Sequence, residues 1–254
     1  MTSTTEASVM AGAVAGARDH ADTSICKIAK RERAINAFAR VTQFLDWPIA
    51  FLVFGAFFRV RIAGRENFKA VKSPFLIVSN HIAFYDSFLF RLALGLFTPH
   101  LPLRFMAVDK FEWKFLNFLA SIGVIEFVYS LFGVFIVVPG LGIERNLEKA
   151  KEIIKVGGNV AIYPEGKIFT RGGIGQFKKG AAVLAKHTGV PVVPVAFRLG
   201  PKHWLRRELS INIGAPVRMS PRDSDESAAG SLRDAVTKLY ESAIHSPSAR
   251  AVVQ

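Results

Sequence analysis

Residues 75–86 read FLIVSNHIAFYD, an apolar run followed by a histidine, aromatic residues and an aspartate. The run FLIVS at 75–79 is apolar throughout rather than alternating, which predicts a strand in a sheet that is covered on both faces. Asp86 is a residue type that commonly begins a helix, and a helical pattern follows it over 86–96. A strand that leads through a short turn into a helix predicts an α/β fold.

The same alternation of strand and helix patterns continues along most of the chain. It predicts one α/β domain over 59–245, with a mostly parallel central sheet flanked by helices. The predicted strands are 59–63, 75–79, 104–108, 134–138, 159–163, 192–197 and 209–213. The predicted helices are 86–96, 113–130, 143–156, 177–188 and 228–244. Residues 246–254 are predicted to be a tail.

The first 58 residues differ in composition from this domain. Residues 1–25 are small and polar and lack the basic and apolar regions of a secretory signal, so we predict a disordered tail. Residues 26–58 join a basic amphipathic stretch to the apolar run WPIAFLVFGAFF at 47–58. This run is shorter than the roughly 20 residues that cross a bilayer, which favours an interfacial or half-inserted helical membrane anchor. An ordinary core helix with a solvated face is the alternative.

Composition points to the same kind of partner. The net charge is +13 and half of the residues are apolar, with a mean hydropathy of +0.28. A basic and apolar chain favours an anionic membrane surface, and no base-reading motif accompanies the charge, so nucleic acid is not expected. The single cysteine, Cys26, excludes an intramolecular disulfide and a cysteine-rich metal site, which is typical of a reducing compartment.

His81 and Asp86 are the titratable pair of the opening stretch. Two side chains five positions apart on one helix point about 140° apart, so this pair converges only if His81 precedes the helix and Asp86 lies in its first turn. The carboxylate would then accept a hydrogen bond from one imidazole nitrogen, and the other nitrogen could take a proton from a hydroxyl or thiol. A buried histidine beside a helix cap is the structural alternative.

A second polar stretch, YPEGKIFTRGGIGQFKKGAA, occupies residues 163–182. Its glycines permit close approach of the backbone to a ligand, and the helix start that follows attracts anions. Lys167, Arg171 and Lys178 add positive charge, so we predict an oxyanion- or phosphate-binding loop that lacks the spacing of a Walker loop. Lysines that are only solvated, or that serve only the membrane surface, are the alternative.

These stretches together resemble the glycerolipid acyltransferases. NHIAFYD at 80–86 resembles the N-H-x-x-x-x-D block of that family, and the Pro-Glu-Gly loop resembles its F-P-E-G block. GVPVVPVAF at 189–197 and INIGAPVRM at 211–219 are similar to its later blocks. The resemblance implies an O-acyltransferase that moves a fatty acyl group from acyl-CoA or acyl carrier protein to the hydroxyl of a lysolipid. Lysophosphatidate, which gives phosphatidate in phospholipid biosynthesis, is the expected acceptor.

The resemblance also implies roles for individual residues. His81 would be the general base, and Asp86 would orient it. No metal or tightly bound cofactor is expected, and the expected partners are membrane lipids and the acyl donor. The expected location is the cytoplasmic face of a membrane, which is the inner membrane if the source is bacterial. The residues implied to bind substrate are Asn80, Glu165, Gly166, Lys167, Arg171 and Lys178.

Two departures from the family pattern concern the acceptor. The family's second block usually ends in an arginine associated with the acceptor phosphate, and GVFIVVPGLG at 133–142 has none. In the third block, Ile168 stands where a second such arginine is usual. Arginine binds phosphate with two parallel hydrogen bonds and isoleucine offers nothing comparable. An acyltransferase for a non-phosphate acceptor, such as an amino-lipid, is therefore one alternative, and a non-catalytic membrane lipid-binding protein is another.

Overall fold

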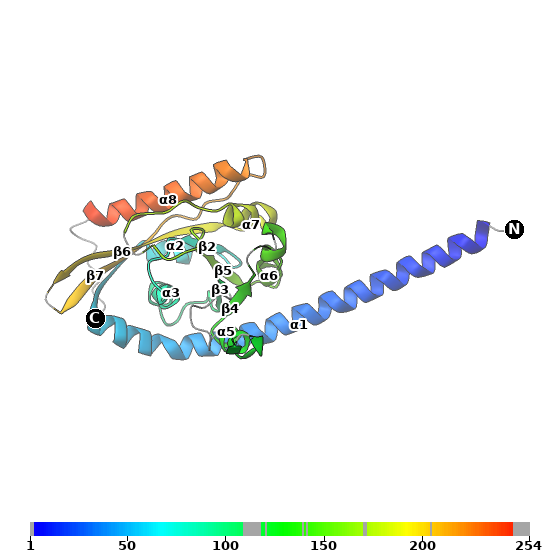
Figure 1. The fold of residues 1–254 in the computed structure, drawn as a ribbon, viewed down its shortest axis with the longest axis horizontal. Coiled ribbons are helices and arrows are strands. Elements are labelled where there is room, and N and C mark those ends of the chain that lie inside the picture. Colours follow the sequence, from blue (N-terminus) through cyan, green and yellow to red (C-terminus); the bar gives the residue numbers. More distant parts are fainter. Residues whose placement is uncertain are drawn as a thin grey trace.

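A single seven-stranded sheet organises the chain, with strand order β1-β7-β6-β2-β5-β3-β4 (Figure 1). The computed structural model describes residues 3–108, 118–119, 121–138, 140, 142–169, 172–203 and 205–245. Neighbouring strands are parallel except β6 and β7, which form an antiparallel hairpin. The predicted α/β fold with a mostly parallel sheet is confirmed. The strands are β1 (Phe58–Ala63), β2 (Leu76–Ser79), β3 (Leu103–Val108), β4 (Val134–Val137), β5 (Asn159–Ile162), β6 (Val192–His203) and β7 (Arg206–Ile213).

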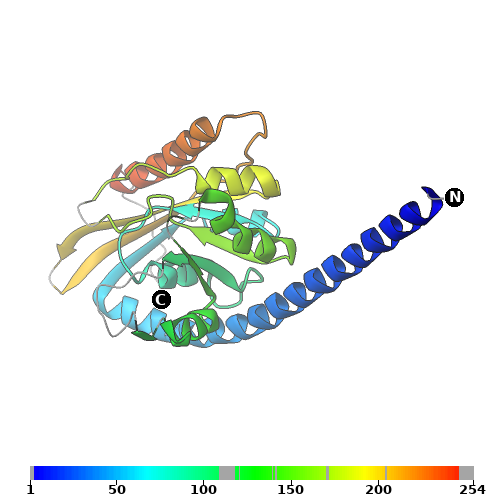
Figure 2. The same cartoon turned by 45° about the vertical axis from the view of Figure 1, so that its right-hand side comes forward.

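Helices cover both faces of the sheet (Figures 1 and 2). On one side lie α1 (Ser3–Phe57), α2 (Arg65–Ala70) and α3 (Asp86–Leu94), with α5 (Val124–Leu131) beside α1. On the other side lie α6 (Ile143–Lys155), α7 (Gly180–Thr188) and α8 (Asp225–His245). Each helical layer encloses its own apolar core against the sheet.

The strand at the centre of the sheet shows why the opening stretch is apolar throughout. Ile77 faces the core under α1 and α3, whereas Leu76 and Val78 face the core under α6, α7 and α8. All three side chains are fully buried. A strand covered on both faces has no position at which a polar side chain reaches water, so the absence of alternation in FLIVS follows directly.

Several elements differ from the prediction. The structure has α1 as one helix from Ser3, with Pro48 inside it, rather than a disordered tail over 1–25 and separate anchoring helices. Alanine recurs in this segment and no proline interrupts it, which suits a helix. β6 and β7 are longer than expected because they extend into a hairpin, and the short α2 was not predicted. The helix predicted at 113–130 begins in residues outside those described, and α5 covers its end.

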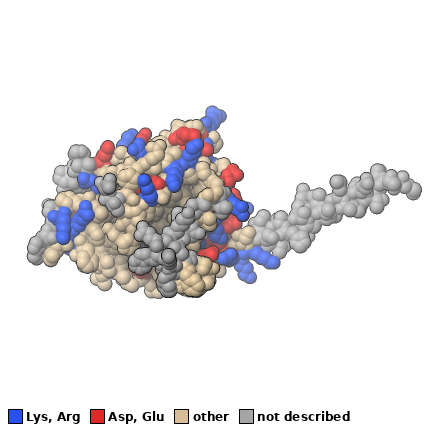
Figure 3. Space-filling view, viewed as in Figure 1, with Lys and Arg blue, Asp and Glu red and all other residues tan. Residues whose placement is uncertain are grey.

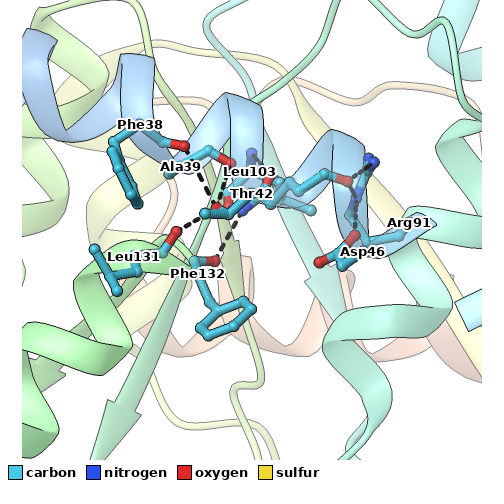
Figure 4. Close-up of polar contacts among 9 residues, drawn as sticks. Phe38, Ala39, Thr42, Asp46, Arg91, Leu103, Leu131 and Phe132 are labelled. Carbon is cyan, nitrogen blue, oxygen red and sulfur yellow. Dashed lines mark hydrogen bonds and ion pairs between the residues drawn. The ribbon is translucent and has the colours of Figure 1, made fainter. Parts of the chain in front are cut away.

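The second half of α1 is bound to the sheet domain by buried side-chain hydrogen bonds (Figure 4). The Gln43 amide nitrogen donates to the carbonyl oxygens of Leu103 and Phe132 at 2.7 and 2.9 Å, and its amide oxygen accepts the N–H of Leu103 at 3.0 Å. The Arg91 Nε lies 3.3 Å from the Asp46 carboxylate and also donates to the Gln43 carbonyl at 2.9 Å. These contacts fix α1 to β3, α3 and the segment after α5.

A buried ion pair makes a further connection closer to the start of α1. The Glu32 carboxylate lies 3.2 Å from the Arg104 guanidinium, and both side chains are almost completely inaccessible to solvent. Lys149 of α6 bonds to the other oxygen of Glu32. Because a buried charge must be paired to be tolerated, this part of α1 belongs to the folded domain. The part of α1 from Glu32 to Asp46 is therefore joined to the sheet domain by its polar side chains.

Candidate active site

Two parallel strands bring the two polar stretches to the same edge of the sheet. β2 pairs with β5 in parallel, with Leu76 opposite Val160. His81 follows the end of β2 and Glu165 follows the end of β5, so both leave the sheet at its carboxyl edge. This edge is where open α/β sheets place their ligand sites.

His81 and Asp86 meet in the geometry required of a base and its orienting carboxylate. His81 lies in the turn before α3, and Asp86 is the first residue of that helix. The His81 Nδ1 and Asp86 Oδ2 atoms are 2.8 Å apart. Because Nδ1 donates this hydrogen bond to a carboxylate, the neutral imidazole has its other nitrogen, Nε2, unprotonated. The His81 side chain keeps 21% of its surface exposed, whereas the Asp86 side chain is fully buried.

Backbone N–H groups complete the environment of the Asp86 carboxylate. The N–H of Ile82 donates to Oδ2 at 2.7 Å, and the N–H of Ala83 lies 3.1 Å from each oxygen. The turn between His81 and α3 therefore wraps around this carboxylate. These bonds fix the direction in which it faces the imidazole.

Tyr163 forms one wall of the site. Its ring stacks on the His81 imidazole, with ring centroids 4.2 Å apart and planes inclined by 13°. An aromatic face is a favourable neighbour for an imidazolium ion. Burial, with a smaller contribution from Asp86, raises the pKa of the Tyr163 hydroxyl well above its usual value, so the phenol stays neutral. The phenolic oxygen itself is buried and makes no hydrogen bond with the described part of the chain.

Glu165 connects the histidine turn to the glycine-rich loop. Its Oε2 accepts the backbone N–H of His81 at 2.9 Å, and its Oε1 accepts the backbone N–H of Gly175 at 2.6 Å. Burial raises the pKa of this carboxyl, and the two N–H donors oppose that rise. Both carboxylate oxygens are therefore used by the protein's own backbone. The observed contacts of Glu165 are with the backbone of His81 and Gly175, and direct substrate contact remains a prediction.

Further backbone hydrogen bonds close the loop against the site. The N–H of Phe169 donates to the carbonyl of His81 at 2.7 Å. The N–H of Gly166 donates to the carbonyl of Tyr163 at 3.1 Å, and that of Lys178 to the carbonyl of Pro164 at 2.9 Å. The loop is thus anchored at its beginning, at its middle and at its end.

The three predicted cations of the loop, Lys167, Arg171 and Lys178, have different surroundings. The Lys178 side chain passes close to Gly166. A Cβ atom added to Gly166 would lie only 2.6 Å from the Lys178 Nζ. Lys167 lies over the ring of Phe169, with its Nζ 5.3 Å from the ring centroid. Lys167 and Lys178 are exposed, and neither has a carboxylate partner in the described part of the chain. Arg171 lies outside the described residues.

Asn80 has a structural partner on the neighbouring strand. Its amide nitrogen donates to the Phe197 carbonyl and its amide oxygen accepts the Phe197 N–H, both at 2.8 Å. This pair of bonds extends the pairing of β2 and β6 one step beyond the end of β2. Because the Asn80 side chain is buried, its predicted contact with substrate has no support in this geometry.

Sequence reasoning missed the backbone partners and the stacked ring. Tyr163 stands at the first position of the Pro-Glu-Gly stretch, which was the available signal for it. The N–H groups of Gly175 and Phe169 carry no signal in a sequence, because every residue except proline has an N–H.

Comparison with known proteins places the chain in a family. The Acyltransferase family model matches residues 59–198, which is more than half of the chain. The chain belongs to the acyltransferase family, and the family resemblance expected from its motifs is confirmed.

Particular relatives carry a more specific name. A chloroplastic 1-acyl-sn-glycerol-3-phosphate acyltransferase of Brassica napus is 33% identical over 144 residues, covering 55% of this chain and 37% of that protein. A 1-acyl-sn-glycerol-3-phosphate acyltransferase of Pseudomonas aeruginosa is 29% identical over 149 residues, covering 58% of this chain and 51% of that protein. The chain therefore spans about half the length of such relatives, or less.

A solved structure shares the fold. The 1-acyl-sn-glycerophosphate acyltransferase PlsC of Thermotoga maritima superposes with a TM-score of 0.54 at 22% identity. The match covers 83% of this chain and 79% of that one. The match therefore extends over most of this chain.

Proposed function

We propose that this protein is an O-acyltransferase that moves a fatty acyl group from a thioester to the free hydroxyl of lysophosphatidate, giving phosphatidate. The observation that carries the proposal is the 2.8 Å contact between His81 Nδ1 and Asp86 Oδ2, which leaves Nε2 as an available base. The names of the similar proteins support the acceptor. The donor is acyl-CoA or acyl carrier protein, and no metal ion takes part in the proposed step.

The reaction follows from this geometry. The acceptor hydroxyl gives its proton to His81 Nε2 while its oxygen attacks the thioester carbonyl carbon, forming a carbon–oxygen bond and a tetrahedral oxyanion. The oxyanion collapses as the carbon–sulfur bond breaks. The departing thiolate takes the proton back from the imidazolium, so the products are an ester and a free thiol. Asp86 and the face of Tyr163 stabilise the imidazolium between these steps.

The acceptor phosphate needs cations other than the missing arginines. Lys167 and Lys178 flank the Pro-Glu-Gly turn, and neither is neutralised by a carboxylate within the described residues. Lys179 bonds to Glu226 and is less available. Lysine binds phosphate as a point charge without the two parallel bonds of arginine, so weaker discrimination for phosphate is expected.

Ile168, at the position where an arginine is usual, favours a second candidate: an acyltransferase whose acceptor lacks phosphate, such as an amino-lipid. Mass spectrometry of lipids after purified protein meets a mixed pool of lysolipids, with acyl-CoA or acyl carrier protein as donor, distinguishes the two. Preferential conversion of lysophosphatidate supports the first candidate. Conversion of only non-phosphate acceptors supports the second, and no conversion with either donor rejects both.

The surface of α1 and α5 supports attachment to a membrane. Large apolar side chains of these helices are exposed, and Figure 3 shows few charged side chains along the lower edge of the body, where both helices lie. Exposed Lys and Arg residues of α1 lie nearer its N-terminus and could each add about 1 kcal/mol of attraction to an anionic surface. The exposed apolar residues are Ile28, Phe38, Val41, Phe44, Leu45, Ile49, Leu52, Val53 and Phe57 in α1, and Val124, Phe127 and Val128 in α5.

The segment Cys26–Phe57 is long and apolar enough to cross a membrane, by length and composition. Its opposite side, however, carries Glu32, Gln43 and Asp46, whose polar groups bond to the sheet domain. We therefore propose that α1 lies along the surface of the bilayer, with its exposed apolar side in the lipid and its polar side on the sheet domain. The cytoplasmic face is the proposed side of the membrane.

A further inference from the structure

The glycine-rich loop is also held by α8, which lies beyond the residues matched by the family model. The Arg233 Nε donates to the carbonyl of Gly175 at 3.0 Å. The N–H of Gly173 donates to the Tyr240 hydroxyl at 3.0 Å. Two side chains of α8 therefore bond to the backbone of this loop two residues apart.

These contacts continue without a gap to the imidazole. Gly175 offers its carbonyl to Arg233 and its N–H to Glu165 Oε1, at 3.0 and 2.6 Å. Glu165 uses its other oxygen for the backbone N–H of His81 at 2.9 Å. His81 in turn contacts Asp86 at 2.8 Å. A series of hydrogen bonds thus joins α8 to the two proposed catalytic side chains.

Close packing around Gly175 leaves little room for the loop to adjust. A Cβ atom added to Gly175 would lie 3.0 Å from the ring of Phe169 and 3.2 Å from Glu165 Oε1. Phe169 itself donates its N–H to the His81 carbonyl. A displacement of Gly175 would therefore move two neighbours that both bond to His81.

A cation fixes the second α8 residue. The Arg198 guanidinium of β6 lies over the ring of Tyr240, 5.6 Å from its centroid. The Arg198 Nε is buried and makes no hydrogen bond with the described residues. The ring of Tyr240 is therefore an important neighbour of this guanidinium. Tyr240 is thus fixed between β6 and the loop, with its hydroxyl at Gly173.

We infer that Arg233 and Tyr240 are positioning residues of the active site. They fix the glycine-rich loop where Glu165 can bond to the backbone of His81, and they thereby set the orientation of the proposed base. The inference rests on the proposed acyl transfer for its kinetic readout. It assigns α8 to the catalytic apparatus, although the residues of α8 form no recognisable motif.

Two substitutions of Arg233 separate its hydrogen bond from its bulk and charge. Arg233→Met keeps a long side chain and removes the donor, whereas Arg233→Gln places an amide nitrogen at the same position along the side chain as Nε. We expect Arg233→Met to lower kcat and kcat/KM equally, by about tenfold to a hundredfold, because a small displacement of a catalytic group is costly. Arg233→Gln should retain most of the activity.

Arg218→Met is the matched control. Arg218 Nη1 donates to the carbonyl of Gly189 at 2.6 Å, so this variant also removes an arginine–glycine hydrogen bond, but at the far end of α7. Its kcat should stay near the wild-type value. Tyr240→Phe, which removes only the hydroxyl oxygen that accepts the Gly173 N–H, should lower kcat in the same direction as Arg233→Met.

The pKa of Glu165 gives a readout that a purely structural role would not move. Burial raises this pKa, and the N–H of Gly175 lowers it. If Arg233→Met lets Gly175 move away, the pKa of Glu165 rises further, and the acid limb of the kcat/KM profile shifts to higher pH. Carbon-13 NMR of the Glu165 carboxyl measures the same rise without any substrate.

The outcomes are distinct. A kinetic loss and a higher Glu165 pKa in Arg233→Met, with neither in Arg233→Gln or Arg218→Met, support the inference. An unchanged Glu165 pKa in Arg233→Met overturns it, as does an equal loss of activity in Arg233→Gln or Arg218→Met. If the wild-type protein transfers no acyl group, the proposed function fails, and the NMR titration still decides whether α8 sets the environment of Glu165.

Discussion

At the scale of single residues, the site is built from side chains that are fixed by backbone groups. Asp86 is held by the N–H groups of Ile82 and Ala83, and Glu165 by those of His81 and Gly175. Within the described part of the chain, the His81 Nε2 atom makes no hydrogen bond. Such preorganisation avoids the cost of reorienting groups during the reaction.

The ring and the hydroxyl group of Tyr163 are expected to have different effects on activity and stability. The ring stacks on His81, but the phenolic oxygen is buried and makes no hydrogen bond with the described residues. Removing an unsatisfied buried hydroxyl should raise the free energy of unfolding, so we expect Tyr163→Phe to be about 1 kcal/mol more stable and to keep its activity. Urea denaturation and transfer assays measure the two effects. Tyr163→Leu is the comparison, because it loses the stacked ring and should lose activity.

At the scale of elements, α1 is part of the folded domain rather than a detachable anchor. The Glu32–Arg104 pair and Gln43 connect it to β3. Asp46 connects it to Arg91 of α3 (Figure 4). The apolar pattern of residues 26–58 predicted the exposed side of this helix. The pattern could not reveal the side of α1 that packs on the sheet domain. In a basic helix, single polar residues such as Glu32 are expected to be solvated, and the sequence does not show that they are buried.

The buried pair gives a test of this connection. Glu32→Gln leaves the Arg104 charge buried and unpaired, so the free energy of unfolding should fall by about 3 to 5 kcal/mol. Glu148→Gln breaks the exposed pair with Lys151 on α6, at 3.0 Å, and should change it by less than about 1 kcal/mol. Chemical denaturation of both variants measures the difference. Equal stabilities would show that α1 contributes little to the fold.

At the scale of the whole molecule, hydrogen bonds join the carboxyl edge of the sheet, the glycine-rich loop and α8, and α1 with α5 provides an apolar surface. The apolar run FLIVS predicted a buried strand of the sheet. The polar residues that follow it, together with the Pro-Glu-Gly turn, predicted the place of the site. Arg233 was not predictable, because its role depends on a contact between residues 58 positions apart. The disordered tail predicted at 1–25 was based on polarity, whereas the structure continues α1 through it.

The membrane surface can be tested with a single charge. Leu52 is 69% exposed on α1, so Leu52→Glu should not disturb the fold. It should reduce binding to vesicles that contain anionic phospholipid by about tenfold or more, because an apolar contact is lost and a like charge is added. Ser231→Glu adds the same charge on α8, at the opposite side of the sheet, and should bind like wild type. Flotation of the purified variants with vesicles measures both, and equal binding would reject the proposed surface.

The central claim is that His81 is the base that activates a lysolipid hydroxyl. The most direct measurement is the rate of acyl transfer to lysophosphatidate by purified wild type, His81→Ala and the exposed-histidine control His187→Ala, with acyl-CoA and with acyl carrier protein. His81→Ala should lose about a hundredfold to ten-thousandfold in kcat, and His187→Ala should match wild type. Near wild-type transfer by His81→Ala would contradict the account.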